Sequence, residues 1–547
     1  MILASSVFDF TPTAQDWLRI LPELIVLGAA LLVLLADLAI PAKGRGWLAL
    51  VGLLGVVAAV VVTAGMWISG DGLTAFNGMI ASDKAALFAD LVILFAAALG
   101  LLFSPGYVER QGIRQHGEYY TLLLLAALGM MLMASAASLL IVFAGLEVLS
   151  LALYILSAFI VARPRSQEAG MKYFILSSFA SAFLLYGMAL TYGATGATAL
   201  TAIHDFVARH AAPTGDFRPL LLAGLGLMAV GFCFKVSAVP FQAWTPDVYV
   251  GAPTSITAFM SVGTKVAAFV ALARVFMVAL GPVAAAWSPV LWAVAVLTMI
   301  GGNLYAVTQR DVKRMLAYSS VANAGYMLVA VVTGTQQALA ALLIYLAAYA
   351  TMNLGAFGVV LALERSDGLG TVLEDFNGLA RRRRGLAAVL AVCLLALAGI
   401  PPTVGFAGKF AVFYAAIAGG RLELAIIGVL TSVLGMFYYL RVIWAMYFVE
   451  PQPARPAPAF VVAPAAPPAS ASAAASSSTG GVAVAEPRIA TTVRADPAAV
   501  SVAETPHVVY PGTWLALALA LIATSALGIL PGALVDLATQ AAQSLLR

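Results

Sequence analysis

The chain has 547 residues, of which 62% are hydrophobic and only 10% charged, with a mean hydropathy of +0.99. A soluble domain usually carries about 25% charged residues, so this composition excludes a soluble globular protein. The formal net charge of +4 gives no reason to expect a nucleic-acid partner. Cys233 and Cys393 are the only cysteines, and both lie in apolar segments. A disulfide framework, a zinc site and an iron–sulfur cluster are therefore not expected in this chain.

Apolar runs recur along nearly the whole sequence, and each is long enough to cross about 30 Å of hydrocarbon as a helix. Their continuous hydrophobicity excludes the alternating pattern of a membrane β-barrel. We therefore predict an all-α polytopic membrane protein of about fourteen transmembrane helices, with boundaries uncertain by several residues. The predicted spans are 18–40, 47–69, 85–105, 118–135, 139–161, 170–193, 220–245, 254–280, 288–309, 315–334, 337–364, 386–418, 423–449 and 512–535.

Two of these spans contain proline, Pro240 in the seventh and Pro401 with Pro402 in the twelfth. Proline removes a backbone donor and clashes with the preceding turn, so each helix is expected to break there. Breaks at matching places in two halves indicate an internal repeat around a transport site. The predicted organisation is an N-terminal segment at 1–117, a first five-helix repeat at 118–280, a second, inverted repeat at 288–449, a loop at 451–510 and a C-terminal helix at 512–547.

The 451–510 segment is rich in Pro, Ala, Ser and Thr. Because such a composition buries too little apolar surface to offset the entropy of ordering, we predict a disordered cytoplasmic loop there. A tolerated insertion is favoured over a binding role. With the amino terminus outside, 17 Lys and Arg residues fall in inside loops and 5 in outside loops and the carboxyl terminus. This bias predicts that both termini lie outside.

Four charged residues, Glu147, Lys235, Lys265 and Lys409, stand well inside apolar runs. Each unpaired charge at such depth costs at least about 2.5–3.5 kcal/mol on insertion scales. One interpretation is a set of buried ion pairs that fixes helix register. A proton path is favoured, because Lys235 and Lys409 lie close to the two proline breaks. Lys172 lies near a predicted helix end, where snorkelling to the interface is an equally good explanation.

Lysine suits a proton path because burial disfavours its charged form while a nearby carboxylate favours it. A Glu147 that moves relative to a lysine would thus load and release protons. The four histidines lie in loops or at helix ends, so an intramembrane histidine relay is not expected. The sequence also lacks a GxGxxG element, a Walker loop and haem ligands. Ion movement must then be driven by a gradient or by another subunit.

Four strings carry a resemblance to a known family: GLEVLSLALYIL around Glu147, EAGMKYFILSSFASAFLLYG from Glu168, FKVSAVPFQAWTPDVYVGAPT from Phe234 and GIPPTVGFAGKF from Gly399. They closely resemble subunit N of bacterial respiratory complex I, the proton-pumping NADH–quinone oxidoreductase, whose mitochondrial counterpart is NADH dehydrogenase subunit 2. The similarity extends through essentially all apolar segments and excludes 451–510.

The resemblance implies fourteen helices with two inverted five-helix repeats, and it gives each charged residue a place. Glu147 falls at the family's fifth-helix glutamate, Lys172 at a sixth-helix lysine and Lys235 at the broken-helix lysine. Lys265 falls at the central lysine of helix eight, and Lys409 at the twelfth-helix lysine on the exit side. The implied route runs from the cytoplasm through helix eight and Lys265 to Lys235 and Lys409, with Glu147 acting on Lys235.

The resemblance also separates the subunits of this family. Subunit M has glutamate where this chain has Lys409, and subunit L continues into a long lateral helix, whereas this sequence ends at Arg547. Some relatives have histidine where this chain has Gln242, which cannot titrate but can hydrogen-bond a water chain. Two other interpretations stay open: an Mrp-type cation/proton antiporter subunit, and a purely structural membrane subunit.

The resemblance further implies that NADH, FMN, the iron–sulfur clusters and quinone are bound by other subunits, with no cofactor or metal in this chain. The implied partners are the lipid bilayer and the M, K and J type subunits of the membrane arm. The implied location is the bacterial cytoplasmic membrane, with both termini on the periplasmic side.

Overall fold

The computed structural model describes residues 12–39, 46–70, 74–210, 218–451 and 509–546. The membrane-length helices are α2 (Leu21–Ala39), α3 (Trp47–Ser69), α4 (Lys84–Arg110), α5 (His116–Ala134), α6 (Leu139–Ser157), α7 (Pro164–Thr195), α9 (Arg218–Lys235), α11 (Thr254–Leu272), α12 (Ala284–Thr308), α13 (Val312–Thr333), α14 (Gln336–Leu363), α18 (Leu422–Phe448) and α19 (Pro511–Ile529). The shorter elements are α1 (Ala14–Arg19), α8 (Leu200–Arg209), α10 (Trp244–Gly251), α15 (Leu379–Arg382), α16 (Arg384–Ala398), α17 (Val404–Ala418) and α20 (Gly532–Leu545). There are also a π-helix, η2 (Ala273–Ala279), two 3-10 helices, η3 (Gly281–Val283) and η4 (Leu373–Phe376), and the strands β1 (Thr74–Ala75) and β2 (Ile80–Ala81).

Within the described ranges, 13 helices are long and apolar enough to cross a membrane. Each of them overlaps one of thirteen predicted spans, with ends that differ by several residues in some cases. The remaining predicted span, 386–418, is present as two half-helices, α16 and α17. The predicted all-α, multi-pass membrane fold is therefore confirmed.

Both helix breaks lie where proline predicted them. The seventh span ends at Lys235 and resumes at Trp244 after a segment that contains Pro240. The twelfth ends at Ala398 and resumes at Val404 after Gly399, Pro401 and Pro402. Proline at these places cannot supply the amide that a continuous helix requires.

The last span differs from its prediction. Instead of one helix ending near residue 535, α19 stops at Ile529 and α20 starts at Gly532 after Pro531. Pro531 ends the first helix because it has no amide hydrogen to donate. Polar residues from Asp536 onward lowered the hydrophobicity on which the predicted end depended.

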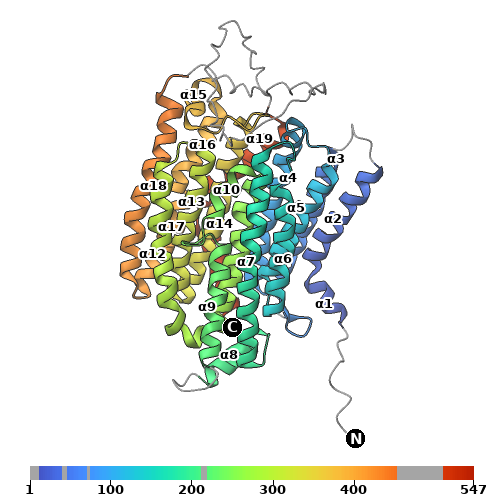
Figure 1. The fold of residues 1–547 in the computed structure, drawn as a ribbon, viewed down its shortest axis with the longest axis vertical. Coiled ribbons are helices and arrows are strands. Elements are labelled where there is room, and N and C mark those ends of the chain that lie inside the picture. The colour runs from blue at the N-terminus through green and yellow to red at the C-terminus, as the bar shows by residue number, and fades with distance from the viewer. Residues whose placement is uncertain (1–11, 40–45, 71–73, 211–217, 452–508, 547) are drawn as a thin grey trace, which may run out of the picture. The chain divides into compact units, whose positions relative to one another are not determined.

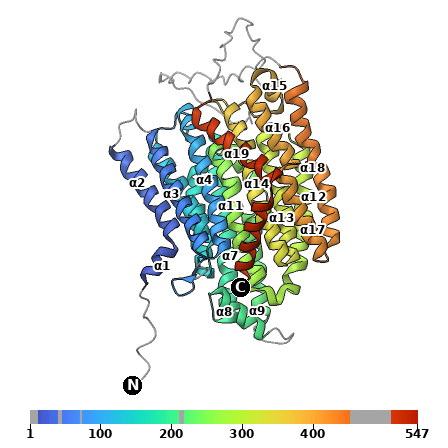
Figure 2. The same cartoon turned by 180° about the vertical axis from the view of Figure 1, so that it is seen from behind.

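In the helical bundle, α11 and α14 pack against each other, and α14 lies near the centre of the view in Figure 1. The blue helices α2 and α3 lie at one edge, and α12 and α18 lie at the other. Seen from behind, α19 and the helix after it run across the bundle, and both pack on α4 and α14 (Figure 2). The inverted relation between the two five-helix units stays a prediction.

Burial separates the central helices from those that face lipid. In the most apolar window of each helix, 94% of the residues are buried in α13 and in α14, whereas only 33% are buried in α12 and in α18. A helix that is apolar all round and buried belongs to the core of a membrane bundle. Polar groups on α11, α13 and α14 are therefore shielded from lipid and from bulk solvent.

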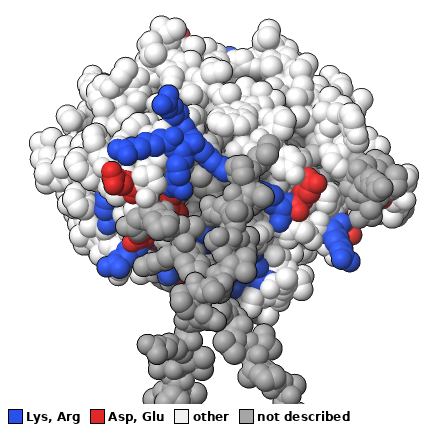
Figure 3. Space-filling view, turned by 90° about the horizontal axis from the view of Figure 1, so that it is seen from above, with Lys and Arg blue, Asp and Glu red and all other residues white. Residues whose placement is uncertain are grey.

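The predicted loop at 451–510 lies, except for residues 451, 509 and 510, outside the described residues. The end of the bundle that carries α15 is rich in basic side chains, as the view onto that end shows (Figure 3). We call it the basic end; its loops and short helix α15 carry Arg163, Arg310, Arg365 and, up to the start of α16, the run from Arg381 to Arg384.

Candidate functional site

Lys235 lies at the last residue of α9, directly before the break, and only 2% of the residue is exposed. Its Nζ donates hydrogen bonds to Ser150 Oγ at 2.8 Å and to the Tyr173 hydroxyl at 3.4 Å. The amine also lies 5.5 Å from the centre of the Tyr173 ring. Tyr173 is itself fixed by stacking on Trp244, with ring centres 4.7 Å apart. The lysine is thus held by uncharged groups from α6 and α7.

Glu147 lies on α6 one turn before Ser150, so both side chains lie on the same side of that helix. Among the described residues it forms no ion pair with Lys235, but its charge acts on that amine through space. Its Oε1 is buried and accepts no hydrogen bond from the described protein atoms. Since an unpaired buried carboxylate oxygen is costly, a water or a moving partner is needed there.

Lys265 lies in the middle of α11, 1% exposed, and reaches into the first break. Its Nζ donates to the backbone oxygen of Val236 at 3.1 Å. Val236 directly follows Lys235, so the Lys265 amine binds the backbone at the same end of α9 where Lys235 lies. The break also leaves Gln242 Oε1 buried and without a hydrogen-bond partner among the described residues, which suits the water-binding role expected for this residue.

Lys409 lies in α17, after the second break, and reaches back to the end of α16. Its Nζ donates to the backbone oxygens of Leu397 at 2.9 Å and Ala398 at 3.1 Å, and to Ser432 Oγ at 2.8 Å. The amine lies 5.1 Å from the centre of the Tyr326 ring. Gly399 has a positive φ of 83°, and a Cβ there would lie 2.9 Å from Lys409 Cδ. Glycine therefore gives both the backbone turn and the space for the lysine.

A polar chain in the core connects the Lys265 region with Lys409. Asn353 on α14 donates to Ser261 on α11 at 2.7 Å. Farther along α14, the Tyr345 hydroxyl donates to Asn323 Oδ1 on α13 at 2.5 Å. Tyr326, one turn beyond Asn323, lies under the Lys409 amine. Three polar atoms along this chain are buried and have no hydrogen-bond partner in the described part of the protein: Asn353 Oδ1, Tyr349 Oη and Ser320 Oγ. Unsatisfied buried groups of this kind bind ordered water.

Lys172 lies outside this buried group. Its Nζ pairs with Asp247 Oδ2 and Glu168 Oε1, each at 2.7 Å, and its side chain is 41% exposed. Asp247 also pairs with Arg314 Nη2 at 2.9 Å. The structure thus brings together Glu147, Lys235 and Lys265, connects them to Lys409, and leaves Lys172 in a charge cluster at the bundle surface. Its role in the path stays a prediction.

The sequence reasoning missed the uncharged members of the chain. Their signal was helical spacing: Ser319, Asn323 and Tyr326 recur at intervals of four and three, and Tyr345, Tyr349 and Asn353 at intervals of four. Such spacings place polar groups on one side of a helix. They were overlooked because only charged residues were weighed against the cost of burial.

Comparison with known proteins assigns the chain to a family. The family model described as NADH:quinone oxidoreductase/Mrp antiporter, transmembrane, matches residues 136–435. The NADH-quinone oxidoreductase subunit N of Trichlorobacter lovleyi is 45% identical over 430 residues, which are 78% of this chain and 87% of that protein. This chain belongs to the NADH-quinone oxidoreductase subunit N family. The resemblance found in the sequence is therefore confirmed.

Solved structures agree with membership of the subunit N family. A chain of respiratory complex I from Thermus thermophilus with bound aureothin has a TM-score of 0.71 at 32% identity, covering 94% of this chain and 98% of that one. A chain of the Mrp complex from Dietzia sp. has a TM-score of 0.76 at 23% identity, covering 98% of both chains. The second likeness shows the shared fold alone.

Proposed function

We propose that this chain conducts protons across a bacterial cytoplasmic membrane as subunit N of a proton-pumping NADH–quinone oxidoreductase. The observation that supports this most is the burial of Lys235, Lys265 and Lys409 at two helix breaks. None of the three has a carboxylate within ion-pair distance among the described residues. A purely structural role for these amines would cost much free energy, because no carboxylate offsets their buried charge.

The geometry suits proton transfer in steps. Lys265 receives a proton from the basic end, which we assign to the cytoplasm. The proton then moves by way of ordered water either to Lys235 at the first break or along the Asn353 and Asn323 chain to Lys409. Glu147 biases the charged form of Lys235, so a movement of α6 changes whether that lysine holds its proton.

The energy for this movement comes from elsewhere in the assembly. NADH, FMN, the iron–sulfur clusters and quinone are assigned to other subunits, and this chain is assigned the proton path alone. The partners are then the M, K and J type subunits of the membrane arm. Both termini lie on the periplasmic side and the 451–510 loop on the cytoplasmic side, in agreement with the basic end and the positive-inside rule.

An Mrp-type antiporter subunit is the competing assignment. It shares the fold, but the Mrp likeness is 23% identical, whereas the subunit N relative is 45% identical. Co-purification with flavin and iron–sulfur subunits is expected for the assignment made here, and isolation only with cation antiporter subunits would contradict it.

The test is proton pumping and NADH–quinone turnover in membranes that carry Lys235→Ala, with assembly checked on a native gel. The complex is expected to assemble while both activities collapse. Lys84→Ala is the matched control, because Lys84 is the first residue of α4 and its amine donates a hydrogen bond to Gln540 Oε1, away from the breaks. Full pumping by the assembled Lys235→Ala complex would remove the role assigned to the lysine.

A further inference from the structure

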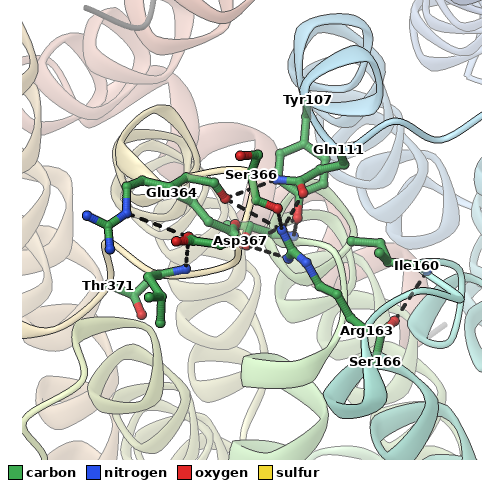
Figure 4. Close-up of polar contacts among 12 residues, drawn as sticks. Tyr107, Gln111, Ile160, Arg163, Ser166, Glu364, Ser366, Asp367 and Thr371 are labelled. Atoms are coloured by element: carbon green, nitrogen blue, oxygen red, sulfur yellow. Dashed lines mark hydrogen bonds and ion pairs between the residues drawn. The ribbon is translucent and has the colours of Figure 1, made fainter. Parts of the chain in front are cut away.

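A buried carboxylate at the basic end is used by none of the steps above. Glu364 directly follows α14, is 2% exposed and lies in the cluster drawn in Figure 4. Its Oε1 pairs with Arg163 Nη1 at 3.1 Å and accepts a hydrogen bond from the Tyr107 hydroxyl at 3.4 Å. Its Oε2 accepts a hydrogen bond from the Thr254 hydroxyl. Glu364 thus connects α4, the start of α7 and the start of α11.

The carboxylate lies directly beneath the surface of the basic end. Ser366 and Asp367, two and three residues farther along, are exposed. Arg163 Nη2 donates to the backbone oxygen of Ser366 at 2.6 Å, so among the described residues this exposed loop lies directly against the ion pair (Figure 4). Water at the basic end therefore reaches loop residues that follow Glu364 by only two and three positions.

Polar residues on α11 continue inward from this point. Thr254 is the first residue of that helix, and Thr257, Ser261 and Lys265 follow at intervals of three, four and four. These spacings place them along one side of the helix. All four are buried. The eleven residues from Thr254 to Lys265 advance about 16 Å at 1.5 Å per residue. One side of α11 thus leads from Glu364 to the central lysine.

The charges around Glu364 explain why a carboxylate is needed at this end. Arg163 is its ion-pair partner, Arg110 on α4 donates to its backbone oxygen at 3.5 Å, and the charge of the buried Lys313 on α13 acts on it through space. Lys313 itself binds the backbone oxygens of Val250 and Ala252. A proton that approaches three cations meets repulsion. The Glu364 charge offsets part of that repulsion where the polar side of α11 begins.

We propose that Glu364 is the proton-collecting residue of this chain, which takes protons at the basic end and delivers them along Thr254, Thr257 and Ser261 to Lys265. The carboxylate accepts a proton from water and releases one toward the Thr254 hydroxyl. Each hydroxyl or water along the way accepts one proton and releases one, and neutral Lys265 takes up the last. This inference rests on the proposed proton-conducting function.

The competing explanation is a structural ion pair, and two substitutions separate the two. Glu364→Gln and Arg163→Gln break the same 3.1 Å pair. Only the first removes the proton-accepting group. The measurement is the number of protons moved per NADH oxidised by the assembled complex in proteoliposomes, with Lys265→Met as reference.

We expect Glu364→Gln to lower this ratio to the value of Lys265→Met, and Arg163→Gln to leave it near the wild-type value. Equal losses for both glutamine variants would indicate a structural pair and overturn the proposal. A normal ratio for Glu364→Gln beside a lowered one for Lys265→Met would also overturn it, while the proposed function stands. A normal ratio for Lys265→Met would count against the proposed function itself.

Thr254→Val keeps the test decisive if Glu364→Gln fails to assemble. Valine has nearly the same shape as threonine and leaves the Glu364–Arg163 pair intact, but it removes the hydroxyl between the carboxylate and α11. The expected result is a lowered ratio in a normally assembled complex. An unchanged ratio in this variant would contradict the assigned path.

Discussion

Among the described residues, three of the four buried lysine amines bind backbone oxygens at the ends of half-helices. Lys265 binds Val236 O just after α9, Lys409 binds Leu397 O and Ala398 O at the end of α16, and Lys313 binds Val250 O and Ala252 O at the end of α10. The last carbonyls of a helix have no internal partner and carry partial negative charge. A lysine held by such carbonyls gains stabilisation of its charged form without a full countercharge, so its proton stays transferable.

Arginine is used differently. Arg274, nine residues after Lys265, forms two hydrogen bonds with Asp83, at 2.8 and 2.6 Å, and donates to Ala134 O. Burial alone would raise the pKa of the Asp83 carboxyl, but the Arg274 charge and hydrogen bonds outweigh it and hold that pKa below its ordinary value. The carboxyl therefore stays charged, and this pair anchors the end of α11 to α4.

Asp83→Asn is expected to lower the thermal stability of the subunit. Removing one partner of a buried pair costs about 3–5 kcal/mol. Because the folded-state pKa is depressed, this contribution is present above the unfolded pKa of about 3.9 and is lost as pH falls through the folded value. The difference between wild type and variant should thus be the same at pH 8 and pH 6. Fluorescence-detected unfolding in detergent measures it, and a difference that disappears by pH 6 would contradict the assignment.

At this scale, the sequence predicted which charges lie deep but not what they contact. Glu147, Lys235, Lys265 and Lys409 were found because a charge inside an apolar run is costly. The predicted spans end at Glu364 and leave Lys313 between two helices. A residue at the edge of an apolar run gives no such signal of burial. The burial of Glu364 and Lys313 comes from neighbouring helices that sequence reading does not place.

At the scale of helices, the proline breaks were predictable and the packing that holds them was not. Gly528 on α19 lies against the second break: a Cβ there would lie 2.5 Å from Pro402 O and from Val404 N. Real side chains do not come this close to backbone, so only glycine permits the contact. The break that positions Lys409 is therefore supported from outside by the last membrane helix.

Gly528→Ala is expected to push the break away from α19, destabilise the subunit by about 1–3 kcal/mol and reduce proton pumping by displacing the carbonyls that hold Lys409. Gly532→Ala is the matched control, because a Cβ at Gly532 has nothing within 4 Å. That control should be neutral or slightly stabilising. Unfolding temperature and pumping rate are the measurements, and equal behaviour of the two variants would contradict the support assigned to Gly528.

At the scale of the whole molecule, one polar chain passes through a bundle whose central helices are almost completely buried. The number of helices and the family followed from the sequence, because hydrophobic length and specific strings determine them. The connection from Ser261 through Asn353 to Asn323 did not, because it depends on how α11, α13 and α14 pack against one another. The chain between the two breaks thus became visible only with the fold.

Lys265 is assigned the passage of protons between the basic end and the two breaks. Its most direct test is the number of protons pumped per NADH oxidised in proteoliposomes containing the assembled complex with Lys265→Met. Methionine keeps much of the side-chain volume and removes only the amine that binds Val236 O. We expect clearly fewer protons pumped per NADH oxidised, with normal assembly of the complex. An unchanged ratio at normal turnover would contradict it, and the buried lysines would then be structural.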